Sequence, residues 1–190
     1  MTWSLPLVGF VGPSGSGKTT LLERIGALLT DAGSRLAMLK HARPGFDIDP
    51  DPGKDSYRLR SAGASQVLIA SRDRWAMLGE QDDPLREPSL EAMLRRLDSS
   101  SLDGVLVEGF GHEQYPKIEV YRPSHSPAPQ YWPQDRSVIA VASDVPMETG
   151  AAIWLDLNDP TAAARFVARQ LGLPYPAGSE DRVQEGLAWE

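Results

Sequence analysis

The sequence predicts an α/β domain with the three-layer fold of P-loop NTPases, in which a mostly parallel sheet carries a β-hairpin extension. Short apolar runs alternate with helical patterns along the chain, which is typical of βαβ units. A glycine-rich run at residues 12–19 joins the first apolar run to the first helical pattern. The 190 residues, 41% of them hydrophobic and 24% charged, suffice for one domain with a substantial core.

The first predicted unit is a strand, a glycine-rich turn, a helix and a second strand. The apolar run at residues 5–11 predicts a buried strand. Apolar residues recur at helical spacing over residues 19–32, and Gly33 is a natural helix stop. Residues 36–39 predict the second strand. We therefore expect parallel strands joined by a right-handed crossover.

The middle of the chain predicts a loop, a short helix and a hairpin. Residues 41–53 are rich in proline, glycine and aspartate, and a loop of this length is a functional candidate. Residues 55–62 predict a short helix with Asp55 as its N-cap. Residues 66–71 and 74–78 have strand character and predict the two arms of a hairpin.

The second half continues the alternation. The expected elements are a helix over 89–97, a strand over 104–107 that ends in Glu108, strands over 118–122, 138–142 and 153–157, and a helix over 161–171. Residues 123–133 carry four prolines and predict a surface loop. We expect one nucleotide-binding domain over residues 1–172 and a flexible tail over residues 173–190.

Composition excludes several classes of function. The net charge of −7 disfavours nonspecific nucleic-acid binding, which needs a positive field. The absence of cysteine excludes disulfides, a thiol nucleophile and a cysteine-based zinc site. No apolar stretch approaches the roughly 18 residues of a membrane span, and residues 1–10 lack the pattern of a secretion signal. These features predict a cytoplasmic protein with no membrane partner.

The glycine-rich run matches the phosphate-binding pattern G-x-x-x-x-G-K-[ST] in full, between a strand and a helix. Its glycines allow successive N–H groups to turn inward as an anion nest, and the helix N-terminus adds positive potential. Lys18 is expected to reach the β- and γ-phosphates, and the Thr19 hydroxyl to bind Mg²⁺. The predicted nucleotide-binding residues are Gly12, Pro13, Ser14, Gly15, Ser16, Gly17, Lys18, Thr19 and Thr20.

A P-loop needs a further acidic group to hold magnesium. Glu108 ends an apolar strand, as the acidic residue of a Walker B element does, and we favour this interpretation over a solvated charge at a strand end. Asp47 and Asp49 in the long loop are the other candidates. The predicted metal ligands are Thr19, Asp49 and Glu108, and the predicted catalytic residues are Lys18 and Glu108.

Four further residues are candidates for binding an anion or an anionic cofactor. Lys40 ends the second strand and His41 follows it, Lys54 precedes the predicted short helix, and Lys117 follows a proline. Each is also compatible with an ordinary surface position. For the base, the Asn-Lys-x-Asp guanine motif is absent. Asp144 follows a predicted strand at a place where one carboxylate can accept the N–H groups of guanine. Asn158-Asp159 is a second candidate, with a helix cap as the alternative role of Asp159.

Several blocks together resemble the MobB family of molybdopterin-guanine dinucleotide biosynthesis. They are the phosphate loop, Lys40-His41 and residues 46–49, 53–57, 62–64, 74–76, 106–110, 116–120 and 138–146. Gly-Lys-Asp-Ser-Tyr at 53–57 and Val-Glu-Gly-Phe at 107–110 are the most specific of them. Residues 42–45 and Gly111 depart from the family pattern, which has additional histidines and a lysine there.

The resemblance implies a homodimeric GTP-binding adaptor with weak GTPase activity that uses GTP and Mg²⁺. Its implied partners are molybdopterin or molybdenum cofactor and the guanylyltransferase that attaches GMP to it. From the P-loop alone, a small-molecule kinase or ligase using ATP is the alternative, because P-loops also serve phosphoryl transfer. A structural protein with a vestigial P-loop is a third interpretation, which the intact Lys18 and Thr19 disfavour.

Overall fold

The computed structural model describes residues 5–42, 44, 46, 48, 50–81, 83 and 85–175, and these residues form two compact units. The first unit contains the residues up to His41 and those from Leu90 onward, and the second is Ala42–Ser89. No helix within the described residues combines the length and apolar character needed to cross a membrane.

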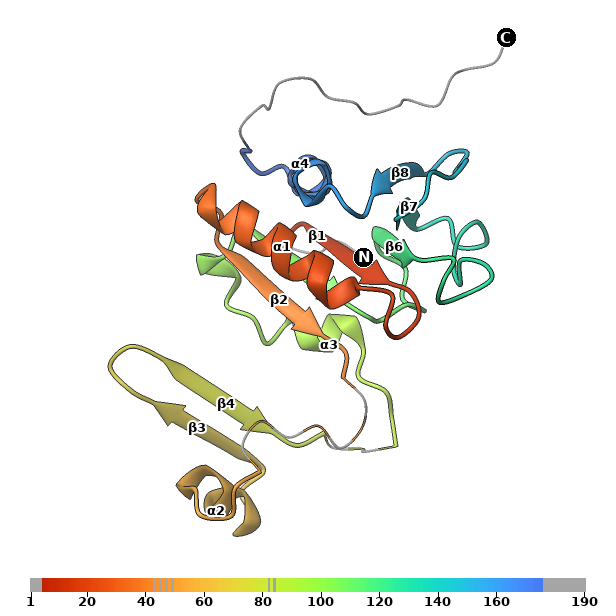
Figure 1. Cartoon of the computed structure of the whole chain (residues 1–190). Coiled ribbons are helices and arrows are strands. Elements are labelled where there is room, and N and C mark those ends of the chain that lie inside the picture. Colours follow the sequence, from red (N-terminus) through yellow and green to blue (C-terminus); the bar gives the residue numbers. More distant parts are fainter. Residues whose placement is uncertain are drawn as a thin grey trace. The chain divides into compact units, whose positions relative to one another are not determined.

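The first unit is built on a six-stranded parallel sheet (Figure 1). Its strands are β1 (Leu7–Val11), β2 (Leu36–Lys40), β5 (Gly104–Glu108), β6 (Lys117–Tyr121), β7 (Val138–Ser143) and β8 (Ile153–Asp156). They lie in the order β2-β5-β1-β6-β7-β8, with β1 paired to β5 on one side and to β6 on the other. The sequence predicted all six strands, because each is a short apolar run between turn signals.

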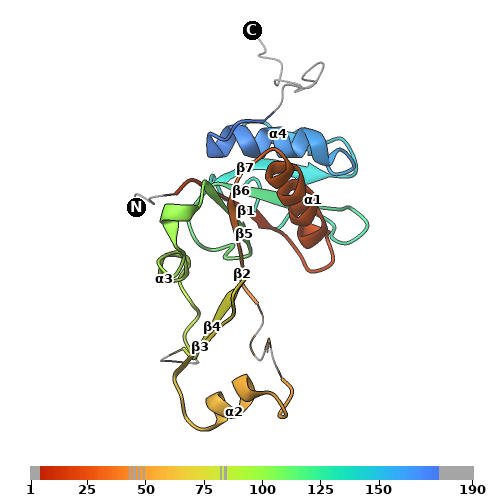
Figure 2. The same ribbon diagram turned by 90° about the vertical axis from the view of Figure 1, so that its left-hand side faces the viewer.

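Helices cover both faces of this sheet. Helices α1 (Lys18–Asp31) and α4 (Pro160–Leu171) pack side by side on one face, and α3 (Leu90–Leu94) lies on the other (Figures 1 and 2). A short 3₁₀ turn, Ser99–Ser101, precedes β5. The predicted three-layer fold with a mostly parallel sheet is therefore confirmed.

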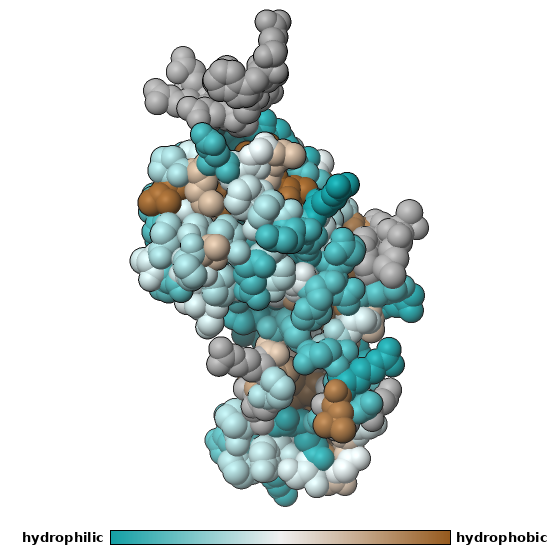
Figure 3. Space-filling model, turned by 90° about the vertical axis from the view of Figure 1, so that its right-hand side faces the viewer, coloured by the Kyte–Doolittle hydropathy of each residue, from teal (hydrophilic) through white to brown (hydrophobic). Residues whose placement is uncertain are grey.

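The second unit holds the predicted hairpin and the short helix. Strands β3 (Gln66–Ala70) and β4 (Trp75–Gly79) pair antiparallel, and α2 (Asp55–Ser61) contacts β3. The N-cap prediction was wrong: the N-cap of α2 is Lys54, in an extended conformation, and Asp55 is the first helical residue. Apolar side chains reach the surface among hydrophilic ones, as Figure 3 shows for one face of the molecule.

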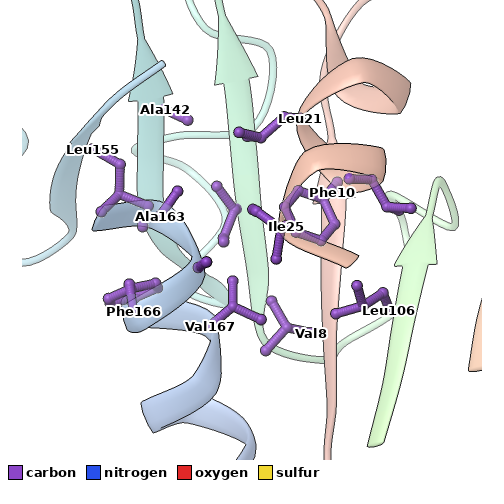
Figure 4. Packing of buried hydrophobic residues seen from close by; sticks show 14 of the residues in the cluster. Val8, Phe10, Leu21, Ile25, Leu106, Ala142, Leu155, Ala163, Phe166 and Val167 are labelled. Atoms are coloured by element: carbon purple, nitrogen blue, oxygen red, sulfur yellow. The ribbon is translucent and has the colours of Figure 1, made fainter. Parts of the chain in front are cut away.

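The largest hydrophobic cluster lies between the sheet and the pair α1 and α4 (Figure 4). Phe10 of β1 and Ile25 of α1 are fully buried there, beside Val167 of α4. Burying side chains of this size contributes about 1.5–3 kcal/mol each. This packing anchors α1 against β1 and so holds the loop between them in place.

Candidate functional site

The glycine-rich loop passes from the end of β1 to the start of α1. Gly12 has φ 129°, and a Cβ there would lie 2.4 Å from the carbonyl oxygen of Val120, so the loop passes β6 too closely for any side chain. Gly17 has φ 101° and is the N-cap of α1. Both glycines are therefore required by the backbone. The first N–H groups of α1 have no intrahelical partner, which makes this helix end an anion site.

Lys18 folds back over this loop. Its Nζ donates to the carbonyl oxygen of Pro13 at 2.7 Å. Burial lowers the pKa of Lys18 below its usual range; the Glu108 carboxylate acts in the opposite direction, and the Lys40 ammonium lowers it further. The ammonium thus lies against the loop that is expected to bind phosphate, with one carboxylate near enough to affect its charge.

Glu108 lies at the centre of the cluster around the phosphate loop. It ends β5, and in the parallel pairing it stands beside Phe10 of β1 and Lys40 of β2. The Thr19 hydroxyl donates to Oε2 of Glu108 at 2.8 Å, and Lys40 Nζ lies 3.2 Å from Oε1. Lys40 Nζ also lies 3.4 Å from Thr19 Oγ1. The structure thus brings together the predicted catalytic pair, two of the three predicted metal ligands (Thr19 and Glu108) and one anion candidate.

These side chains fit a magnesium ion that is bound together with a nucleotide. The Thr19 hydroxyl and the Glu108 carboxylate are hard oxygen ligands within hydrogen-bond distance of each other. Among the described residues, no three His, Cys, Asp or Glu side chains form a ready-made metal site. Asp47 and Asp49, the acidic alternatives, lie outside the described residues.

His41 lies beside this cluster, where it stacks on Phe110. The two rings are 4.7 Å apart at 26°, and His41 N–H donates to the Glu108 carbonyl at 2.8 Å. Gly109 and Phe110 both have positive φ, 97° and 52°. A Cβ at Gly109 would lie 2.8 Å from the Cβ of His41. The backbone after β5 is therefore forced into a conformation uncommon for a residue such as Phe110, a kind of strain that clusters at functional sites.

Lys117 and Lys54 are not brought to the phosphate loop by any described contact. The Lys117 side chain is fully buried, and its ammonium donates to the carbonyls of Gly111 and Glu113 and to Asp135 Oδ2, at 2.7, 2.8 and 2.6 Å. These bonds use all three donors, so the geometry favours a structural role for Lys117 over the predicted anion binding. Lys54 belongs to the second unit, and its role stays a prediction.

Asp144 follows β7, and its partner was not predicted. Arg122, the residue after β6, donates from Nη1 to Asp144 Oδ2 at 2.6 Å and from Nε to the Ser16 carbonyl at 3.1 Å. The only sequence signal for Arg122 is its place as the last residue of the predicted strand over 118–122. Asp159, the second candidate for the base, is the N-cap of α4 and accepts from the Ala162 N–H.

Comparisons with known proteins agree on one family for this chain. Residues 7–144 match the family described as molybdopterin guanine dinucleotide synthesis protein B, or MobB. The molybdopterin-guanine dinucleotide biosynthesis adapter protein of Escherichia coli is 45% identical over 163 residues, which cover 86% of this chain and 91% of that protein. The protein of the same name from Haemophilus influenzae is 38% identical over 172 residues, which cover 90% of this chain and 92% of that protein.

A solved structure supports the same family. The crystal structure of Bacillus subtilis MobB superposes with a TM-score of 0.70 at 26% identity, covering 88% of this chain and 98% of that one. The resemblance found in the sequence blocks is thus confirmed in sequence and in fold. This chain belongs to the MobB family.

Proposed function

We propose that this chain is a cytoplasmic GTP-binding adapter in molybdopterin-guanine dinucleotide biosynthesis, with at most weak GTPase activity. Its relatives from two bacteria carry the adapter name at 45% and 38% identity. The proposed partners are molybdopterin or molybdenum cofactor and the guanylyltransferase that attaches GMP to it. The observation that carries nucleotide binding is the hydrogen bond between Thr19 and Glu108, which joins the phosphate loop to the acidic end of β5.

In this proposal the loop N–H groups and the N-terminus of α1 bind the phosphates, and Lys18 leaves Pro13 to contact them. Thr19 and Glu108 would hold Mg²⁺, which neutralises phosphate charge. Lys40 already pairs with Glu108, so it is a further positive charge at the same place. Hydrolysis at such a site depends on positioning and charge stabilisation, for which Lys18 and Glu108 are the chain's own candidates.

Isothermal titration with GTP, GDP and ATP, each with Mg²⁺, tests this proposal. We expect GTP to bind more tightly than ATP, and Lys18→Ala to abolish triphosphate binding. Arg136→Gln, at an exposed position in the loop before β7, is the control and keeps binding. Retained tight binding in Lys18→Ala would refute the assignment of the phosphate site. A preference for ATP would instead favour a kinase or ligase.

We also propose that the protein is a homodimer in which the hairpin of one copy contacts a second copy. Leu68, Trp75 and Met77 share one face of the hairpin and are 65%, 66% and 44% exposed. Large apolar side chains that gather on one exposed face favour a protein neighbour. Light scattering with size-exclusion chromatography is expected to give a dimer for the wild type and for the control Leu85→Lys. We expect Met77→Lys to shift the protein to monomer, and an unchanged dimer in Met77→Lys would exclude this face.

A further inference from the structure

Arg122 joins the phosphate loop to Asp144. Its backbone follows β6, the strand that pairs with β1, and its guanidinium bonds in two directions. Nε donates to the carbonyl oxygen of Ser16, and Nη1 donates to Asp144 Oδ2. The side chains of Arg122 and Asp144 are 31% and 25% exposed, so both are largely withdrawn from solvent. The Ser16 carbonyl belongs to the loop after β1, Arg122 follows β6, and Asp144 follows β7.

The contact with Ser16 has a physical reason. An anion nest directs backbone N–H groups toward the phosphates, which turns the carbonyls of the same peptides away from them. Such an outward carbonyl needs a donor when it is buried, and Ser16 is fully buried. Arg122 supplies that donor from behind the loop, with Nε and Nη2 both 3.8 Å from the place a Cβ would take at Gly17. The guanidinium therefore lies against the outer surface of the loop.

The contact with Asp144 leaves acceptor capacity in the carboxylate. Oδ2 accepts from Arg122 at 2.6 Å, while the buried Oδ1 accepts no hydrogen bond from any described residue. A carboxylate has about four lone-pair positions and the Asp144 side chain is 25% exposed, so it can accept from Arg122 and from a ligand together. Guanine presents an N1–H and an N2–H₂ group on one edge, which a single carboxylate can bind as a pair. Adenine has an acceptor at N1 and lacks the 2-amino group.

We propose that Arg122 is a positioning residue for guanine recognition, which aligns the Asp144 carboxylate with the base by anchoring it to the phosphate loop. This inference rests on the proposed GTP binding. In this arrangement two neighbouring strands jointly supply the arginine and the aspartate, in place of one contiguous guanine motif. Because the guanidinium is a rigid fork, it holds the Ser16 carbonyl and Asp144 at a defined separation, which a lysine at this position does not reproduce fully.

Titration calorimetry with GTP, xanthosine triphosphate (XTP) and inorganic tripolyphosphate, all with Mg²⁺, tests this role. Arg122→Gln is expected to weaken GTP binding about ten- to hundredfold, the range for a lost hydrogen bond to a charged group. Tripolyphosphate has no base, so its affinity is expected to change by less than about threefold. Arg122→Lys is expected to recover part of the GTP affinity, and Arg136→Gln is the matched exposed control.

Asp144→Asn tests the base contact separately. Xanthine carries a C2 carbonyl where guanine has an amino group, so the asparagine amide can donate to that carbonyl while its oxygen accepts N1–H. The variant is therefore expected to prefer XTP over GTP. In Arg122→Gln combined with Asp144→Asn, GTP affinity is expected to lie within about threefold of Asp144→Asn alone, because Arg122 acts through Asp144.

The outcomes separate this inference from the proposed function. Equal loss of GTP and tripolyphosphate in Arg122→Gln would make Arg122 a phosphate contact and overturn the positioning role. Additive losses in the double variant, or no gain of XTP binding in Asp144→Asn, would also overturn it while GTP binding by the wild type stands. A wild type that does not prefer GTP to ATP would overturn the proposed function and this inference with it. If Arg122→Gln does not fold, Arg122→Lys and Asp144→Asn decide the question.

Discussion

Replacing Asp135 by asparagine tests the buried ion pair with Lys117. The Lys117 side chain has no exposed area, that of Asp135 is 15% exposed, and the two charged groups are 2.6 Å apart. In Asp135→Asn the ammonium keeps the carbonyls of Gly111 and Glu113 but loses its counter-charge. Breaking one side of a buried ion pair costs about 3–5 kcal/mol.

The lower end of that range applies to this pair. Asp135 is partly exposed, and the asparagine oxygen can still accept one hydrogen bond from Lys117. We therefore expect a loss of about 3 kcal/mol in the free energy of unfolding. For a chain of this size each kcal/mol lowers Tm by about 2–4 °C, so the expected decrease in Tm is about 6–12 °C.

Circular dichroism melts at neutral pH measure this decrease, with Glu91→Gln as the control. Glu91 pairs with Arg95 one helical turn away, in a more exposed setting, and surface pairs of this kind contribute little. A decrease in Tm below about 2 °C in Asp135→Asn would refute the reasoning, because the buried charge would then not depend on its partner. A second variant, Lys117→Met, tests the structural role of Lys117 directly. If this variant folds but no longer binds GTP, Lys117 is an anion-binding residue, as the sequence predicted.

Three further predictions concern the phosphate loop and the acid limit of stability. Glu108→Gln removes the carboxylate that accepts from Thr19. We expect the ratio of GTP affinity with Mg²⁺ to that without Mg²⁺ to be about ten- to hundredfold smaller in this variant than in the wild type. An unchanged ratio, measured by titration calorimetry, would place the metal elsewhere. Gly12→Ala places a Cβ 2.4 Å from the Val120 carbonyl oxygen, at a φ of 129°. We therefore expect titration calorimetry to show that nucleotide binding is lost, while circular dichroism still shows a folded protein. Burial alone would raise the pKa of Asp135, but hydrogen bonds from Lys117 and Ser137 outweigh it and lower the pKa below its ordinary 3.8. Its contribution to stability is therefore present above about pH 4 and is lost as the pH falls through the folded-state pKa, so urea melts at decreasing pH should show a smaller acid loss in Asp135→Asn than in the wild type.

Much of the fold could be predicted because its signals are local. The strands of the parallel sheet are short apolar runs, and α1 follows a phosphate-loop pattern whose glycines are required by the backbone at Gly12 and Gly17. Glu108 was found in the same way, as a carboxylate at the end of an apolar strand. The error at the start of α2 is a shift of one residue, which is the usual uncertainty of a helix boundary.

Burial of charge on β6 could not be predicted. Lys117 and Glu119 alternate with Ile118 and Val120, which is the pattern of a strand with one solvated face. The structure buries both charged residues because the segments before and after β6 supply their partners. Asp135 pairs with Lys117, and the Glu119 carboxylate accepts from the backbone N–H groups of residues 130–132. The loop predicted from its prolines, residues 123–133, thus supplies the hydrogen bonds that make the burial of Glu119 possible.

The sequence by itself determined the phosphate loop, the individual strands and the family, since each depends on short blocks of residues that are neighbours along the chain. Only the tertiary structure decided which charges meet. Arg122 reaches Ser16 across 106 positions and Asp144 across 22, and Thr19 reaches Glu108 across 89. Such contacts depend on the order in which strands pair, because the carboxyl ends of parallel neighbours meet at one edge of a sheet. No local pattern encodes that order, so a site of this kind becomes complete only in the folded chain.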